Sequence, residues 1–74
     1  MNSTIMRRLD SLHDAFAENV ARFDEAYRAW NSLPKDDYEG RKIMRARCDV
    51  LCDDGDRIMS EIKSLNQLLD EACK

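Results

Sequence analysis

The chain contains few helix-breaking residues and no long apolar run. Of its 74 residues, two are glycine and one is proline, and aromatic residues make up 7%. This composition is typical of long helices rather than of sheets or disordered segments. No stretch approaches the roughly 20 apolar residues that a membrane-spanning helix needs. The amino-terminal residues carry charges every few positions and lack an apolar signal-peptide core, so we expect a cytoplasmic protein that does not enter a membrane.

The length and charge of the chain limit its architecture and its partners. Residues 1–74 predict a single domain, and a chain this short buries too little surface to be very stable alone. Such chains depend on idealised helix packing, disulfides, a metal or a partner subunit. The net charge of −3 has the wrong sign for a general nucleic-acid binder. We expect the three cysteines to be reduced in the cytoplasm.

The segment CDVLCDDGDRIM at residues 48–59 contains the residue types that bind metals, but not their spacing. Zinc needs four ligands, and the single histidine, His13, is expected about two helical turns from Cys52. Cys48 and Cys52 are therefore predicted to fill space as small apolar residues. The aspartates lack the spacing of a calcium loop and are predicted to face water. No catalytic residue, cofactor or metal ligand is predicted, and we expect no enzymatic activity.

Apolar residues recur at steps of three and four on both sides of the segment NSLPKDD at residues 31–37. Before this segment the apolar series is Ile5, Leu9, Leu12, Phe16, Val20, Phe23, Tyr27 and Trp30. After it the series is Met44, Cys48, Leu51, Gly55, Ile58, Ile62, Leu65, Leu69 and Ala72. Each series forms one face of a helix. The sequence therefore predicts an all-α antiparallel hairpin with helices over about residues 3–31 and 37–73.

The loop and the position of Gly55 determine where these helices begin and end. Pro34 lacks the N–H that a helix interior requires, and Asp36 followed by Glu39 predicts the amino-terminal cap of the second helix. Asp-Gly is usually a turn signal, but the apolar series continues through Gly55 without a change of phase, which predicts one continuous helix. The alternative is a break near Gly55 and a three-helix bundle. In the hairpin, Gly55 is expected to be a notch for Phe16.

The two edges of the predicted hairpin differ in polarity. When Leu9 and Cys48 are assigned to heptad position a, the residues at position g are mainly charged, whereas those at position e are mainly apolar. We call the e edge the apolar strip; its predicted interface residues are Met6, His13, Val20, Tyr27, Tyr38, Cys52 and Met59. Contiguous exposed apolar surface usually marks a protein interface. Two hairpins joined along the strip would form a homodimeric four-helix bundle, although a different protein could cover the same strip.

A short basic run is the second candidate contact site. It consists of Arg41, Lys42, Arg45 and Arg47. These side chains could contact phosphates, but Asp24 and Glu25 are expected to approach Arg45 and Arg47 across the hairpin and to neutralise them. No aromatic platform or helix-turn-helix pattern accompanies the run, so the sequence favours a protein partner over nucleic acid.

These features favour a small non-enzymatic protein-interaction module that binds another protein through a helical surface. Adaptors, chaperone-like proteins and regulatory or inhibitor proteins share this architecture, which is an analogy of fold alone. One alternative is a nucleic-acid-associated regulator that uses the basic run at residues 41–47. Another is an inhibitor of a host system that a phage or mobile element encodes.

Overall fold

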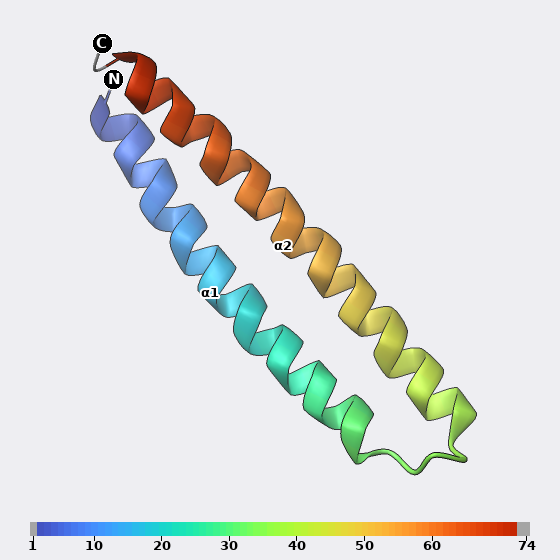
Figure 1. Ribbon diagram of the computed structural model, residues 1–74. Coiled ribbons are helices and arrows are strands. Elements are labelled where there is room, and N and C mark those ends of the chain that lie inside the picture. Colours follow the sequence, from blue (N-terminus) through green and yellow to red (C-terminus); the bar gives the residue numbers. More distant parts are fainter. Residues whose placement is uncertain (1, 73–74) are drawn as a thin grey trace.

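The computed structural model describes residues 2–72, which form two long antiparallel helices joined by a short loop (Figure 1). Helix α1 spans Asn2–Ser32 and helix α2 spans Tyr38–Ala72. The helices lie side by side, so the first turn of α1 neighbours the last turn of α2. The hairpin measures 57 × 15 × 12 Å. The predicted all-α antiparallel hairpin is confirmed.

The loop at residues 33–37 reverses the chain through three short-range backbone hydrogen bonds, one of them from the Tyr38 N–H to the Asp36 carbonyl at 3.0 Å. The Leu33 N–H donates to the Trp30 carbonyl at 3.3 Å, and the Asp37 N–H donates to the Pro34 carbonyl at 3.1 Å. Pro34 itself has no N–H to donate to the preceding turn. Helix α1 therefore ends before Pro34, as the sequence predicts.

The amino-terminal cap of α2 is Asp37, whereas the sequence predicts Asp36. The Gly40 N–H donates to Oδ1 of Asp37 at 3.0 Å, which is the hydrogen bond that a cap residue makes with the third helical residue. Glu39 lies in the first turn of α2, where the helix dipole stabilises a carboxylate. The prediction of Asp36 is wrong by one residue because two adjacent aspartates give nearly the same capping signal.

The buried core is small and lies mainly in the half of the hairpin away from the loop. Leu9, Leu12 and Ile62 form a buried cluster with exposed fractions of only 4–6%. The partly buried residues that pack against it are Ile5, Ile58, Leu65 and Leu69. Nearer the loop, Ala26 is also buried. Most of the inward-facing stripe is therefore only half shielded from water.

Helix α2 runs through Gly55 without a break. The predicted continuous helix is confirmed, and the alternative of a three-helix bundle is wrong. Gly55 is buried, and the side chain that lies closest to it is that of Asn19. The Asn19 Nδ2 donates to the Leu51 carbonyl at 2.9 Å.

The absence of a side chain at Gly55 makes this hydrogen bond possible. Helical side chains lean toward the amino terminus and cover the preceding turn, so a side chain at position 55 would lie over the Leu51 carbonyl. A Cβ at Gly55 would lie 2.8 Å from Oδ1 of Asn19 and 3.9 Å from Cε1 of Phe16. The notch predicted for Phe16 therefore accommodates Asn19 more closely than Phe16.

The inward face of α1 also differs from the predicted apolar series in its second half. Asn19 is half-buried and Ala26 is 5% exposed, whereas Val20 and Tyr27 are 43% and 49% exposed. The sequence placed Val20 and Tyr27 in the stripe because they are larger and more apolar than their neighbours. Position d of the heptad instead belongs to Asn19 and Ala26, which continue the spacing that begins with Leu12.

Aromatic side chains and one arginine pack at the loop end of the hairpin. The guanidinium carbon of Arg41 lies 4.4 Å from the centroid of the Trp30 ring, which is a cation–π geometry. Tyr27 stacks on Phe23 with ring centroids 6.2 Å apart, and it lies 6.1 Å from Trp30. This packing joins the last turns of α1 to the first turn of α2, far from the leucine–isoleucine cluster.

The contact between Asn19 and Gly55 predicts a strong energetic coupling. In the native chain, Gly55→Ala displaces the Asn19 amide from the Leu51 carbonyl at a cost of about 1–3 kcal/mol. This cost cancels or exceeds the ~1 kcal/mol that alanine gains over glycine in a helix. In an Asn19→Ala background, Gly55→Ala should instead stabilise the protein by ~1 kcal/mol. Urea unfolding of the single and double variants at one chain concentration measures the coupling, and additive effects would contradict the contact.

Candidate interaction surfaces

The hairpin exposes more surface than a compact monomer of its mass. Its accessible surface is 5991 Å², whereas the scaling for folded monomers gives about 4,700 Å² for 8.6 kDa. Roughly 1,300 Å² of the surface is therefore in excess. Large apolar side chains that are 43–78% exposed contribute to it: Met6, Val20, Tyr27, Tyr38, Ile43, Val50 and Leu68.

The apolar strip lies along one edge of the hairpin. The contacts of Asn19 with Leu51 and of Trp30 with Arg41 establish the register of the two helices. In this register the e positions of α1 and α2 fall on the same edge. From α1 this edge receives Met6, His13, Val20 and Tyr27, which are all exposed.

The α2 side of the apolar strip contains both apolar and polar residues. Cys52 is exposed and Met59 is half-buried, and the exposed Arg45 and Asn66 also occupy e positions. Tyr38, the first residue of α2, is 78% exposed. The strip is thus available for contact along its length, and its role as an interface stays a prediction.

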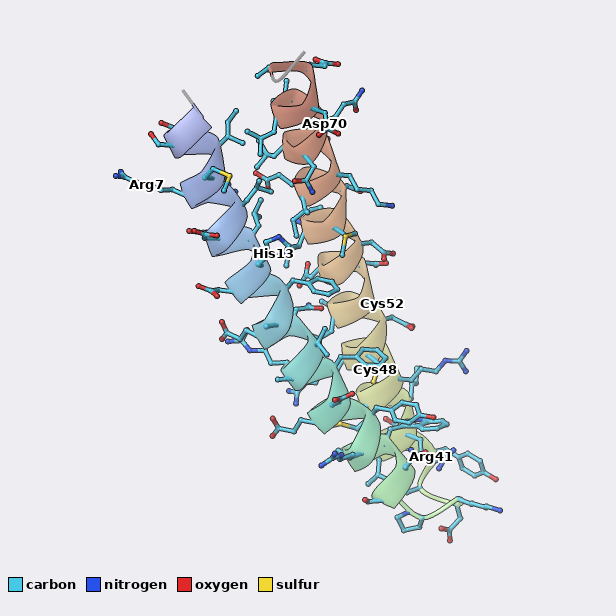
Figure 2. The ribbon with its side chains drawn as sticks, turned by 60° about the vertical axis from the view of Figure 1, so that its left-hand side comes forward. Arg7, His13, Arg41, Cys48, Cys52 and Asp70 are labelled. Atoms are coloured by element: carbon cyan, nitrogen blue, oxygen red, sulfur yellow. The ribbon has the colours of Figure 1, made fainter. Side chains whose placement is uncertain are left out.

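The cysteines differ in their surroundings, although the sequence predicts the same filler role for Cys48 and Cys52. They lie on successive turns of α2 (Figure 2). Cys48 is half-buried, whereas Cys52 is exposed on the apolar strip. The filler role is therefore wrong for Cys52 within a single hairpin, and its role as an interface residue stays a prediction. Cys73 lies outside the described residues. Within residues 2–72, no cluster of three or more histidine, cysteine, aspartate or glutamate side chains could hold a metal ion.

The middle of the opposite edge is charged, as predicted. The Arg8 side chain donates from Nε and Nη2 to Oε1 of Glu61, at 3.0 and 2.8 Å, and so joins the two helices. Both side chains are about half exposed, and exposed ion pairs contribute about 0–1 kcal/mol. This edge can therefore face water without a partner.

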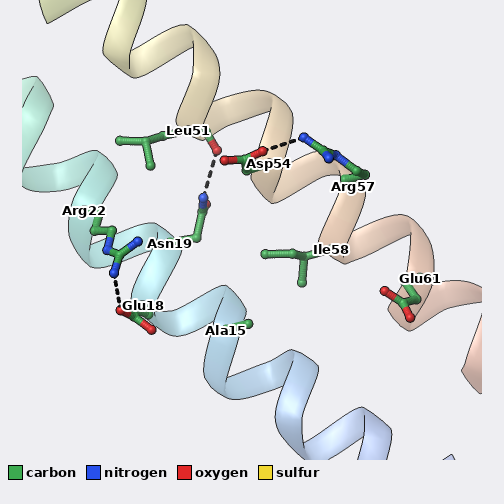
Figure 3. Close-up of a pocket in the computed structure, with 9 residues that line it drawn as sticks. All are labelled: Ala15, Glu18, Asn19, Arg22, Leu51, Asp54, Arg57, Ile58 and Glu61. Carbon is green, nitrogen blue, oxygen red and sulfur yellow. Dashed lines mark hydrogen bonds and ion pairs between the residues drawn. The ribbon is translucent and has the colours of Figure 1, made fainter.

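A groove of about 350 Å³ lies along this charged edge (Figure 3). Two ion pairs lie along it, between Glu18 and Arg22 on α1 and between Asp54 and Arg57 on α2. Glu61 lines its end and pairs with Arg8. Each carboxylate that lines this groove is thus paired with an arginine.

The same edge becomes apolar toward the loop, which the sequence analysis missed. We call this part the loop-side groove; it has a volume of about 560 Å³. Its lining residues are Arg22, Glu25, Ala26, Ala29, Met44, Ala46, Arg47, Val50 and Leu51. Ile43 and Val50, seven residues apart at the same heptad position, are 58% and 60% exposed. The seven-residue spacing of Ile43 and Val50, together with Ala29 at a g position, is the sequence pattern that indicates an apolar surface here.

The basic run does not form one patch. Arg41 lies at the loop end of the hairpin over Trp30 (Figure 2), while Lys42, Arg45 and Arg47 occupy three different heptad positions and so point to different sides of α2. Across the described part of the chain, no ion pair joins these four residues to a carboxylate. Glu25 and Arg47 nevertheless line the same groove, so the expected neutralisation by Asp24 and Glu25 stays a prediction.

Neither helix contains, within the residues described, a segment that is long and apolar enough to cross a membrane.

The position of Arg41 predicts a structural role that its neighbour Lys42 lacks. Arg41→Ala removes the cation from the Trp30 ring and should lower the free energy of unfolding by about 0.5–2 kcal/mol. Lys42→Ala is the matched control, because Lys42 is exposed on the same turn and should change stability by less than about 0.5 kcal/mol. Unfolding followed by the fluorescence of Trp30, the single tryptophan, measures both effects. Equal effects of the two substitutions would contradict the structural role.

Comparisons with protein-family models, with curated proteins and with solved structures found no significant match to this chain. Its function therefore has to be inferred from its own surfaces.

Proposed function

We propose that the chain is a small non-enzymatic protein-interaction module that presents a helical surface to another protein. The observation that carries this proposal is the exposed apolar strip on a hairpin with a small core. Met6, Val20 and Tyr27 are 43–52% exposed along one edge, whereas four apolar residues in the described part of the chain are buried. Contiguous exposed apolar surface usually marks a protein interface.

The first partner in this proposal is a second copy of the chain. Two hairpins packed along their apolar strips form a four-helix bundle with two-fold symmetry. A standard interface buries about 800 Å² per partner, which is within the roughly 1,300 Å² by which the hairpin exceeds a compact monomer. The charged opposite edge, with its ion pair between Arg8 and Glu61, would remain in water. Once dimerised, the module could act as an adaptor, a chaperone-like protein, a regulator or an inhibitor.

The same surfaces give less support to a nucleic-acid-associated regulator. Phosphate contacts supply most of the affinity for nucleic acid and require several cations on one face. Arg41 packs on Trp30, and the other three cations of the run occupy different heptad positions. The net charge of −3 also opposes binding to a polyanion.

Met59→Asp tests the apolar strip as the self-association surface. In the dimer, a carboxylate at this e position would be buried against the partner copy without a counter-charge. The free-energy cost of burying an unpaired charge is large, so the dimer should dissociate into monomers. Much of the helix content should remain. Light scattering measures the mass, and circular dichroism measures the helix content.

Ser60→Asp is the matched control, because Ser60 is the next residue on α2 and is exposed outside the apolar strip. It should leave the native mass unchanged. Val20→Asp, on the α1 side of the strip, should dissociate the dimer as Met59→Asp does. If Met59→Asp and Val20→Asp both retain a dimer, the strip is not the interface.

A further inference from the structure

We propose that the two copies of the dimer pack antiparallel, so that the loop of one hairpin lies beside the open end of the other and α2 runs along α2 of the second copy. This inference rests on the proposed function, because it specifies how a second copy occupies the apolar strip. The observation that carries it is a column of charged residues that borders the strip on α2.

The charged column consists of the residues at heptad position b of α2. Position b lies next to position e on the helix surface, because successive residues are about 100° apart. The members of the column are spaced seven residues apart: Lys42, Asp49, Asp56, Lys63 and Asp70. All of these side chains are exposed. None of them forms an ion pair within residues 2–72, so their charges remain free to meet those of a second copy.

An antiparallel second copy of the charged column supplies the opposite charge to each end of the first. When the two-fold axis passes through Asp56, Lys42 lies opposite Asp70 of the second copy. The same arrangement places Asp49 opposite Lys63. Two-fold symmetry forms each of these contacts twice, and all of them join opposite charges. Only Asp56 meets its own copy, which is a contact between like charges at the axis.

The parallel orientation of the two hairpins gives no such match. With both loops at the same end, α1 of one copy faces α2 of the other. Position b of α1 then brings Asp10 near Lys63 of the second copy, which is favourable. It also brings Asp24 near Asp49, which is repulsive. Because these contacts cancel, the charges beside the strip select the antiparallel orientation.

The same two-fold axis lies at the middle of the apolar strip. On α2 it falls near the midpoint between Cys52 and Met59, so these residues face each other across the dimer. On α1 the corresponding level is near Phe16, because Phe16 lies beside Gly55. The strip residues of α1 are distributed evenly on the two sides of this level. Each of them is therefore covered by a strip residue of the second copy.

The charged column determines orientation more than affinity. An exposed ion pair adds little to stability, whereas like charges placed opposite each other disfavour the wrong arrangement. In coiled coils, charges that flank the apolar seam set partner choice and helix orientation in the same way. The apolar strip therefore supplies the free energy of association, and the charged column selects the antiparallel dimer.

Charge reversal at the two ends of the column tests this orientation. Lys42→Glu and Asp70→Lys should each weaken dimerisation about fivefold, because each places like charges opposite each other twice in the dimer. The double variant Lys42→Glu/Asp70→Lys restores the opposite charges and should dimerise within about twofold of the native chain. Sedimentation equilibrium at low salt, where screening is weak, measures the dimer dissociation constant of each chain.

This coupling is specific for contact between two copies. Within one chain, Lys42 and Asp70 lie about 40 Å apart along α2, at 1.5 Å per residue, so they do not interact directly. Lys42→Glu/Gln67→Lys is the matched control, because Gln67 is exposed one turn before Asp70 but lies outside the column. This control should dimerise as weakly as Lys42→Glu alone.

Asp56→Asn tests the position of the axis. It removes the like-charge contact and should tighten the dimer about twofold. Asp53→Asn is the control, since Asp53 is exposed on the same turn, lies outside the column and changes the net charge equally. It should leave the dissociation constant unchanged, and equal effects of the two substitutions would contradict an axis at Asp56.

The measurements separate the orientation from the proposed dimer. A native dimer in which Lys42→Glu and Asp70→Lys have additive effects would overturn the antiparallel orientation and leave the dimer in place. A native chain that is monomeric at every concentration would overturn the proposed dimer, and the orientation with it.

Discussion

Two helices packed against each other can shield only the sides that face one another, and this constraint governs the whole molecule. Each helix of the hairpin packs one narrow apolar face against its neighbour. The residues on both sides of that face remain in contact with water. The buried residues Leu9, Leu12 and Ile62 form a cluster in one half of the hairpin, while most other inward residues are half-buried. The energetic consequence is a marginal monomer, because hydrophobic stabilisation is roughly proportional to the apolar area removed from water.

The two edges that remain in contact with water differ in polarity. The charged edge is made compatible with water by ion pairs such as Arg8–Glu61, which also links α1 to α2. The apolar strip has no comparable protection, and we infer that a second copy covers it. In the middle of the hairpin, the hydrogen bond from Asn19 to the Leu51 carbonyl adds a polar contact at an inward position. Such a contact sets the register of the two helices, since Asn19 finds this carbonyl uncovered only beside Gly55.

The sequence predicted the features of the fold that depend on periodicity. Both ends of α1 and the start of α2 differ from the prediction by one residue, and residue 73, the predicted end of α2, lies outside the described residues. The persistence of the apolar series through Gly55 correctly indicated a continuous helix. The cap was placed at Asp36 instead of Asp37, because neighbouring aspartates are nearly equivalent as sequence signals. The inward position of Asn19 is not evident from polarity, because its neighbour Val20 is more apolar; only the heptad spacing indicates it.

The surfaces were harder to predict than the helices. The apolar strip could be derived from the e positions, since a single heptad column defines it. The loop-side groove combines residues from both helices and from different heptad positions, for example Ala29 and Val50, so neither helix alone shows it. The residues of the basic run are close in sequence but separate in the fold, because Arg41 packs on Trp30 and Arg47 lines the groove on the edge opposite the apolar strip.

The central claim is that one hairpin buries too little apolar surface and that a second copy completes its core. Thermal unfolding of the native chain over a wide range of concentrations tests this claim directly. Association of folded chains makes the unfolding midpoint depend on concentration. We expect the midpoint to rise steadily with chain concentration, because association with a second copy stabilises the folded hairpin. A midpoint that stays constant over the whole range would show that no second copy stabilises the hairpin, and would contradict the claim.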